Sequence, residues 1–189
     1  MSIAGDKLNV ANGSSPAPWF ARALDKKAAA LAFAVGLATI LGAWGSQYIG
    51  GLVPCELCLE QRLAYYSGLP LLAAILILWN RLPLTVWFIA MALATAIFAW
   101  GTYMGAYHAG VEWGFWPGPT ACTGTGIGVS FDDLNNINAA KVIPCDKVQF
   151  TLFGISLAGY NALISLGIVG LLLIAIGDQW RRMRAARTA

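Results

Sequence analysis

The sequence predicts an all-α membrane protein, a four-transmembrane-helix bundle with a long loop between the third and fourth helices. Of its 189 residues, 58% are hydrophobic and only 11% are charged, which is too apolar for an ordinary soluble domain of this length. Four apolar runs reach the roughly 20 residues that a helix needs to cross a bilayer. The net charge of +3 is too small to suggest nucleic acid as a partner.

The four runs define a membrane domain over residues 28–176. Any single run could be a buried helix of a soluble core, but four of them leave too little polar chain to cover such a core. The expected spans are 28–48, 59–79, 84–103 and 152–176.

The first span is expected to be a retained anchor and not a cleaved signal peptide. Its apolar run exceeds the usual 7–15 residues, and a long polar segment precedes it. That N-terminal segment, residues 1–27, is rich in Gly, Ser and Pro and is predicted to be disordered.

The basic residues indicate the orientation of the bundle. With four crossings, nine of the twelve fall on one face, which the positive-inside rule makes cytoplasmic together with both termini and the basic tail 177–189. The other face receives the loops 49–58 and 104–149, and every cysteine lies there or at its membrane edge. Disulfides persist in the periplasm or outside the cell, so these loops are predicted to be periplasmic. The nine residues are Lys7, Arg22, Lys26, Lys27, Arg81, Arg181, Arg182, Arg184 and Arg187.

The segment Pro54-Cys-Glu-Leu-Cys58 is predicted to open the second helix, since proline suits a first turn. Unpaired backbone N–H groups and the helix dipole stabilise a thiolate there. Arg62 lies at i+4 from Cys58 and shares its face, where a guanidinium stabilises a thiolate or polarises a ligand carbonyl. The alternative for Arg62 is snorkelling to the headgroups. Glu56 and Glu60 are expected to face water and carry no chemistry.

Two further cysteines, Cys122 and Cys145, lie in a loop rich in glycine and proline. A four-cysteine zinc site would favour a second close pair, which is absent, and haem attachment needs a histidine where Leu59 stands, so no metal is expected. A structural disulfide would account for this later pair. It accounts poorly for Cys55 with Cys58, because so short a loop constrains the unfolded chain little.

His108 is the single histidine of the chain. Its expected depth, just past the third span, matches that of Cys58 and Arg62, and Glu112 lies one turn further if the helix continues. Its candidate role is in the site, and the alternative is an ordinary interfacial residue.

Together these residues resemble the disulfide bond formation protein B (DsbB) family of the bacterial inner membrane. The resemblance covers residues 28–176 and rests on Pro54-Cys-Glu-Leu-Cys-Leu-Glu-Gln-Arg62, the later pair Cys122 and Cys145, and Phe153-Gly154 opening the last span. The vitamin K epoxide reductase family is similar in chemistry, but its loop cysteines precede the Cys-x-x-Cys pair, whereas here they follow it.

The resemblance implies a quinone-dependent oxidoreductase in the bacterial inner membrane that reoxidises a periplasmic thioredoxin-like dithiol oxidase (DsbA-type). It implies disulfides Cys55–Cys58 and Cys122–Cys145, with the partner attacking at Cys122 and Cys58 passing electrons to ubiquinone or menaquinone. It further implies quinone contacts for Arg62 and His108. The alternative function is a non-enzymatic four-span membrane protein with structural disulfides.

Overall fold

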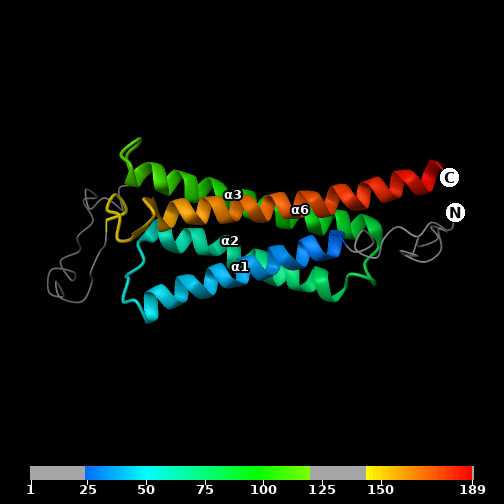
Figure 1. The fold of residues 1–189 in the computed structure, drawn as a ribbon, viewed down its shortest axis with the longest axis horizontal. Helices are drawn as coiled ribbons and strands as arrows, with labels where there is room; N and C mark the ends of the chain where they lie inside the picture. The colour runs from blue at the N-terminus through cyan, green and yellow to red at the C-terminus, as the bar shows by residue number, and fades with distance from the viewer. Residues whose placement is uncertain (1–23, 120–143, 189) are drawn as a thin grey trace.

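The computed structural model describes residues 24–119 and 144–188, which form four helices and one short hairpin of strands (Figure 1). Cys122, the segment 1–23 and most of the predicted loop 104–149 lie outside the described residues. The helices are α1 (Leu24–Tyr48), α2 (Glu56–Ile77), α3 (Leu84–Glu112) and α6 (Leu157–Thr188).

The helices start close to their predicted positions, but two run on beyond the predicted spans. α3 continues to Glu112, so the boundary expected at 104 is not a helix end. α6 continues to Thr188, so the basic segment after 176 is helical. Hydropathy falls before these helices end, whereas backbone hydrogen bonding continues through the polar residues.

A two-stranded hairpin precedes α6 and corrects the predicted start of the last helix. Strand β1 (Thr151–Leu152) pairs antiparallel with β2 (Ile155–Ser156). Phe153 and Gly154 form the turn with φ angles of 48° and 81°, a left-handed conformation that glycine adopts readily. The prediction that Phe153-Gly154 opens the last span is therefore wrong, because both residues precede the helix.

The core of the bundle is apolar and close-packed where α3 meets α6 and α2. Trp87, Phe98 and Leu172 are fully or nearly fully buried there. At Gly105 an added Cβ would lie 2.7 Å from the backbone nitrogen of Ala162, so α3 and α6 can approach this closely only with glycine at that position.

One end of the bundle carries an ion-pair cluster. Asp25, in the first turn of α1, is buried and contacts the guanidinium of Arg182 on α6, which also pairs with Asp178 at 3.1 Å. Figure 1 shows the start of α1 and the end of α6 together at this end, with the α2–α3 connection, while the start of α2, where Cys55 and Cys58 stand, lies at the opposite end.

Three of the described helices, α1, α3 and α6, are long and apolar enough to cross a membrane. α2 is not among them, since its first turns carry Glu56, Glu60, Gln61 and Arg62. The predicted all-helical membrane class is thus confirmed, with three candidate spans among the described residues.

Candidate functional site

A disulfide between Cys55 and Cys58, as the family resemblance implies, lies at the N-terminus of α2, which begins where the sequence predicts. Cys55 is the N-cap residue, and its Sγ accepts a hydrogen bond from the Cys58 backbone N–H at 3.3 Å. Cys55 is buried, whereas Cys58 is half-buried. The N–H of Cys58 thus points at Cys55 Sγ, so a thiolate formed on Cys55 is stabilised by the helix terminus.

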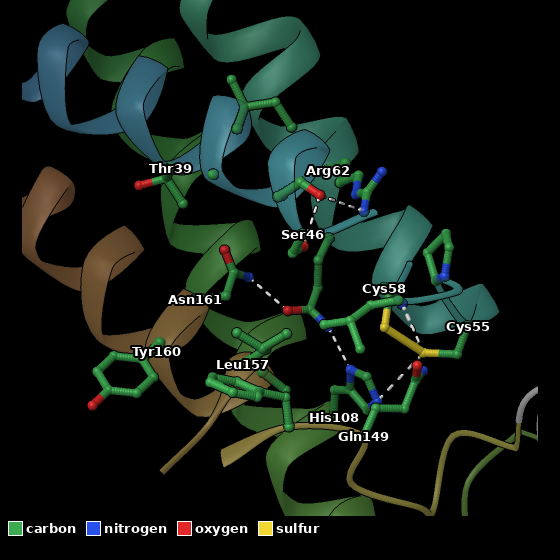
Figure 2. Close-up of a pocket in the computed structure, with 18 of the residues that line it drawn as sticks. Thr39, Ser46, Cys55, Cys58, Arg62, His108, Gln149, Leu157, Tyr160 and Asn161 are labelled. Atoms are coloured by element: carbon green, nitrogen blue, oxygen red, sulfur yellow. Dashed lines mark hydrogen bonds between the residues drawn. A yellow bond between two sulfur atoms is a disulfide. The ribbon is translucent and has the colours of Figure 1, made fainter. Parts of the chain in front are cut away.

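His108 on α3 lies directly against this disulfide. Its Nε2 is 3.7 Å from Cys55 Sγ, and its Nδ1 is 2.6 Å from Nε2 of Gln61 on α2 (Figure 2). An amide nitrogen only donates, so Nδ1 accepts and the proton of the neutral ring sits on Nε2, facing the sulfur. The sequence placed His108 at the depth of Cys58, and the continued α3 helix is what brings it there.

Gln61 belongs to a hydrogen-bonded chain of buried polar groups that links α2 to α6. Its Oε1 accepts from Asn161 Nδ2 at 2.7 Å, and the Tyr65 hydroxyl donates to Asn161 Oδ1 at 2.7 Å. Because the Tyr65 proton is used there, Ser165 donates to the Tyr65 oxygen across 3.0 Å. We call Gln61, Asn161, Tyr65 and Ser165 the polar ladder. It runs from His108 into the apolar interior.

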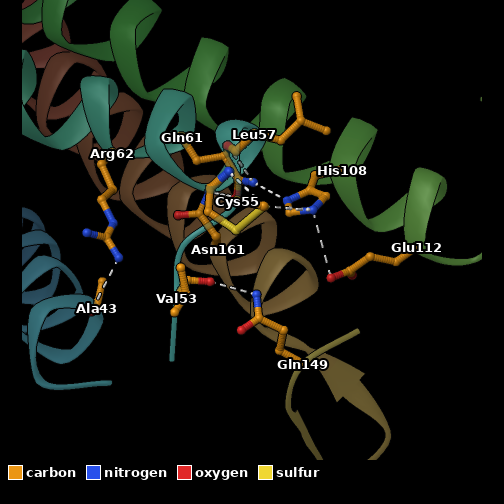
Figure 3. The surroundings of a disulfide bond; sticks show 11 residues. Ala43, Val53, Cys55, Leu57, Gln61, Arg62, His108, Glu112, Gln149 and Asn161 are labelled. Carbon is orange, nitrogen blue, oxygen red and sulfur yellow. Dashed lines mark hydrogen bonds and ion pairs between the residues drawn. A yellow bond between two sulfur atoms is a disulfide. The ribbon is translucent and has the colours of Figure 1, made fainter. Parts of the chain in front are cut away.

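Glu112 follows His108 by one helical turn, and its carboxylate faces the His108 ring (Figure 3). Its Oε1 lies 4.0 Å from His108 Nε2, and its side chain is only 7% exposed. Its Oε2 is buried and has no hydrogen-bond partner among the described residues. The Ser156 side chain hydrogen-bonds this carboxyl group, so Oε2 is the one oxygen of Glu112 that is left for a further ligand.

Cys145 lies at the same end of the bundle, in the segment that leads into strand β1. It is 1% exposed and packs with Cys55, Leu57, Met104 and Val111 in one buried cluster. Its backbone hydrogen-bonds to the His108 ring. The pairing of Cys145 with Cys122 stays a prediction, because Cys122 lies outside the described residues.

The guanidinium of Arg62 makes its hydrogen bonds to α1 and not to the disulfide. Its Nη1 donates to Gln47 Oε1 at 2.6 Å and its Nη2 to the Ala43 carbonyl at 3.4 Å, both on α1. Figure 3 shows the side chain extending from α2 toward α1, on the opposite side of the site from His108. The arginine is half-buried and held between two helices.

These groups line one cavity of about 400 Å³ between α1, α2 and α6. Most of its wall surface is apolar, and its polar side chains come from all four helices and from the segment before β1. That combination is typical of a site for a largely apolar small molecule. The site residues in its wall are Cys55, Cys58, Gln61, Arg62, His108, Glu112 and Asn161.

The sequence did not single out the polar ladder. The available signal was two polar pairs at i,i+4 spacing, Gln61 with Tyr65 and Asn161 with Ser165, each on one face of an otherwise apolar helix. Nothing in the spacing says that these two faces meet across nearly 100 residues.

A disulfide that caps a helix, beside a histidine and an apolar cavity at one end of a bundle of apolar helices, defines a membrane thiol–disulfide redox protein. The match to a family model sharpens this class. The chain belongs to the family described as disulfide bond formation protein DsbB, whose model matches residues 25–175. Membership implies a disulfide-generating oxidoreductase in a family that uses quinones.

No curated protein and no solved structure matched the chain.

Proposed function

We propose that the protein oxidises a periplasmic thioredoxin-like dithiol oxidase of the DsbA type and passes the electrons through two cysteine pairs to a membrane quinone, supporting disulfide bond formation. The observation that carries the proposal is the shared cavity: Cys58 and Arg62 both line an apolar space between helices of membrane-spanning length. A disulfide that served only stability would not need such a space beside it.

The proposed topology has four spans, with α2 as the second, in the bacterial inner membrane. α2 has 22 residues, about 33 Å of helix, and packs against α1 and α3. Two of the polar residues that lower its hydropathy face the protein, since Gln61 is buried and Arg62 is half-buried and bonded to α1. Such an orientation removes most of their cost in lipid. The cysteine end is then periplasmic and both termini are cytoplasmic.

The cavity fits a quinone head group in size and chemistry. Its volume of about 400 Å³ lies within the usual range for small-molecule sites, roughly 300–1,000 Å³. Arg62 supplies donors for a carbonyl oxygen, Cys58 stands in the wall as the electron donor, and His108 is the further candidate contact. Bound there, ubiquinone or menaquinone supplies a two-electron acceptor.

The cysteines form a balanced relay in this proposal. The partner thiolate attacks Cys122, forms a mixed disulfide and releases the Cys145 thiolate, which attacks Cys55 and releases the Cys58 thiolate. The second partner thiolate then frees Cys122, which reforms the bond to Cys145 and leaves Cys55 reduced. The partner is oxidised by two electrons, and these remain on Cys55 and Cys58. The common buried cluster of Cys145 and Cys55 supports this transfer.

In this proposal the site stabilises Cys58 as a thiolate once the disulfide is reduced. The dipole of α2 favours a negative charge in its first turn, where Cys58 lies, and Arg62 follows Cys58 by one helical turn. His108 Nε2 lies 3.7 Å from Cys55 Sγ, close enough for an N–H there to stabilise negative charge that develops on that sulfur.

The test is quinone reduction by the purified protein supplied with a reduced thioredoxin-like dithiol partner. Cys58→Ser is expected to abolish turnover, and the matched change at an exposed position of the same helix, Ser67→Ala, is expected to leave it intact. Full turnover by Cys58→Ser would sink the proposal. A non-enzymatic protein with structural disulfides predicts instead no quinone reduction and both pairs fully oxidised on thiol trapping.

A further inference from the structure

We infer that the reduced form of the Cys55–Cys58 pair is a binding site for a single thiophilic divalent cation, with zinc as the best fit. The ligands that already lie together are Cys55 Sγ, Cys58 Sγ and His108 Nε2. A Glu112 carboxylate oxygen, 4.0 Å from His108 Nε2 but outside that group, would complete the set after a change of side-chain rotamer. Two sulfurs, one imidazole nitrogen and one carboxylate oxygen make a donor set suited to tetrahedral zinc.

The distances already suit a metal ion. The two sulfurs and His108 Nε2 all lie within 4.8 Å of one another. Zinc–sulfur bonds of about 2.3 Å and zinc–nitrogen bonds of about 2.0 Å place tetrahedral ligand atoms roughly 3.5–3.8 Å apart. The Cys55 Sγ to His108 Nε2 distance is 3.7 Å. Reduction breaks the S–S bond and lets the two sulfurs move apart to the spacing that two zinc ligands need.

Glu112 supplies the independent indication of a ligand. Its Oε1 is 4.0 Å from His108 Nε2, and its Oε2 is buried without a hydrogen-bond partner in the described part of the chain. A divalent cation between the sulfurs and the imidazole would offset two of the three negative charges of the two thiolates and this carboxylate. The Cys58 N–H, which already donates to Cys55 Sγ, would support the metal-bound thiolate.

The polar ladder can supply the second shell that a metal-bound histidine needs. A ligating Nε2 has no proton, so Nδ1 must carry one and needs an acceptor. Rotating the Gln61 amide turns its oxygen toward Nδ1, and the matching rotation of Asn161 restores the bond between the two amides. The Tyr65 hydroxyl then donates to Ser165 in place of Asn161. Metal binding would also disturb the hydrogen bond that the Cys145 backbone makes to the His108 ring.

Binding requires the dithiol and releases its protons, so the oxidised protein offers no site. A bound ion ties up both sulfurs and thereby holds the pair reduced. Free zinc would therefore inhibit electron transfer to the quinone reversibly, by binding at the stage of the cycle in which Cys55 and Cys58 are thiols.

The experiment uses the full chain in detergent with Cys122→Ser and Cys145→Ser, reduced by a phosphine and freed of reductant without oxygen. Cobalt(II) serves as the spectroscopic probe and zinc as its competitor. The expected result is one cobalt per reduced chain with thiolate charge-transfer and tetrahedral ligand-field bands, displaced by one equivalent of zinc. The oxidised protein should show neither band. The measurement needs no quinone and no partner, so its outcome is separate from that of the proposed function.

Variants separate this site from adventitious binding to a dithiol. His108→Ala and Glu112→Gln should each weaken zinc binding, and Gln61→Met should weaken it about 10- to 100-fold through the lost second shell. Glu60→Met places the same residue at the neighbouring exposed position and should change nothing. His108→Gln and helical circular dichroism guard against misfolding. Wild-type zinc affinity in both His108 variants, or equal cobalt binding by the oxidised chain, would overturn the inference.

Discussion

Gln61→Met tests whether the polar ladder contributes to the fold as well as to the site. The substitution keeps the length of the side chain but leaves His108 Nδ1 and Asn161 Nδ2 without the partners they have at 2.6 and 2.7 Å. The Leu57 carbonyl, which Gln61 Nε2 also contacts, keeps its helical hydrogen bond and adds no loss.

The expected loss is about 2 kcal/mol. A buried group left unsatisfied costs about 1–3 kcal/mol, whereas side-chain hydrogen bonds between membrane helices average about 0.6 kcal/mol. Two orphaned groups therefore give about 2–6 kcal/mol on the first scale and about 1.2 kcal/mol on the second, and a loss of about 2 kcal/mol lies where the two scales meet. For a chain of this size, about 2 kcal/mol lowers the Tm by roughly 4–8 °C.

The assay is thermal unfolding of the oxidised protein in detergent, followed by circular dichroism. Glu60→Met is the control, because Glu60 is exposed and its change removes no described hydrogen bond. If both variants unfold at the same temperature, the polar ladder does not stabilise the bundle and the two unsatisfied groups cost less free energy than expected.

Three further predictions concern packing, ion pairing and the cavity. Gly105→Ala should destabilise the bundle by about 1–3 kcal/mol because its Cβ meets the α6 backbone, while Gly167→Ala, with open space around it, should be neutral or stabilising in the same unfolding assay. Asp25→Asn should lower the unfolding midpoint, because it removes the buried ion pair of Asp25 with Arg182 on α6. The control Asp146→Asn changes an exposed carboxylate and should leave the midpoint unchanged. Equal shifts in the two variants would contradict this prediction. Arg62→Gln should raise the quinone KM at least about tenfold. Arg62→Lys should give an intermediate KM, because lysine keeps the positive charge but lacks the two parallel N–H donors of the guanidinium. An unchanged KM in Arg62→Gln would exclude Arg62 from the quinone site.

The local chemistry of the site could be predicted from the sequence because it depends on spacing within one helix. The Pro-Cys-x-x-Cys segment predicts a helix start, and Cys55 is the N-cap of α2. Glu56 and Glu60 are exposed, as expected. The membrane class follows from composition and is confirmed by the family match.

What could not be predicted depends on contacts between helices. The end of α3 was missed because hydropathy marks where lipid contact fades, not where helical hydrogen bonds stop. Asn161 was missed because an uncharged amide in an apolar helix becomes informative only when its partner, here Gln61, is known. The turn at Phe153-Gly154 was read as helix because the apolar run continues through it.

The length of α6 has a consequence for how the protein sits in its bilayer. Its 32 residues extend for about 48 Å, whereas the hydrocarbon layer is about 30 Å thick. About three turns must therefore lie among or beyond the lipid phosphates, and the final turns carry Arg181, Arg184 and Arg187 on exposed positions. Anionic lipids would hold this projecting end against the surface, so lipid charge and bilayer thickness together set the tilt of the helix that carries Asn161.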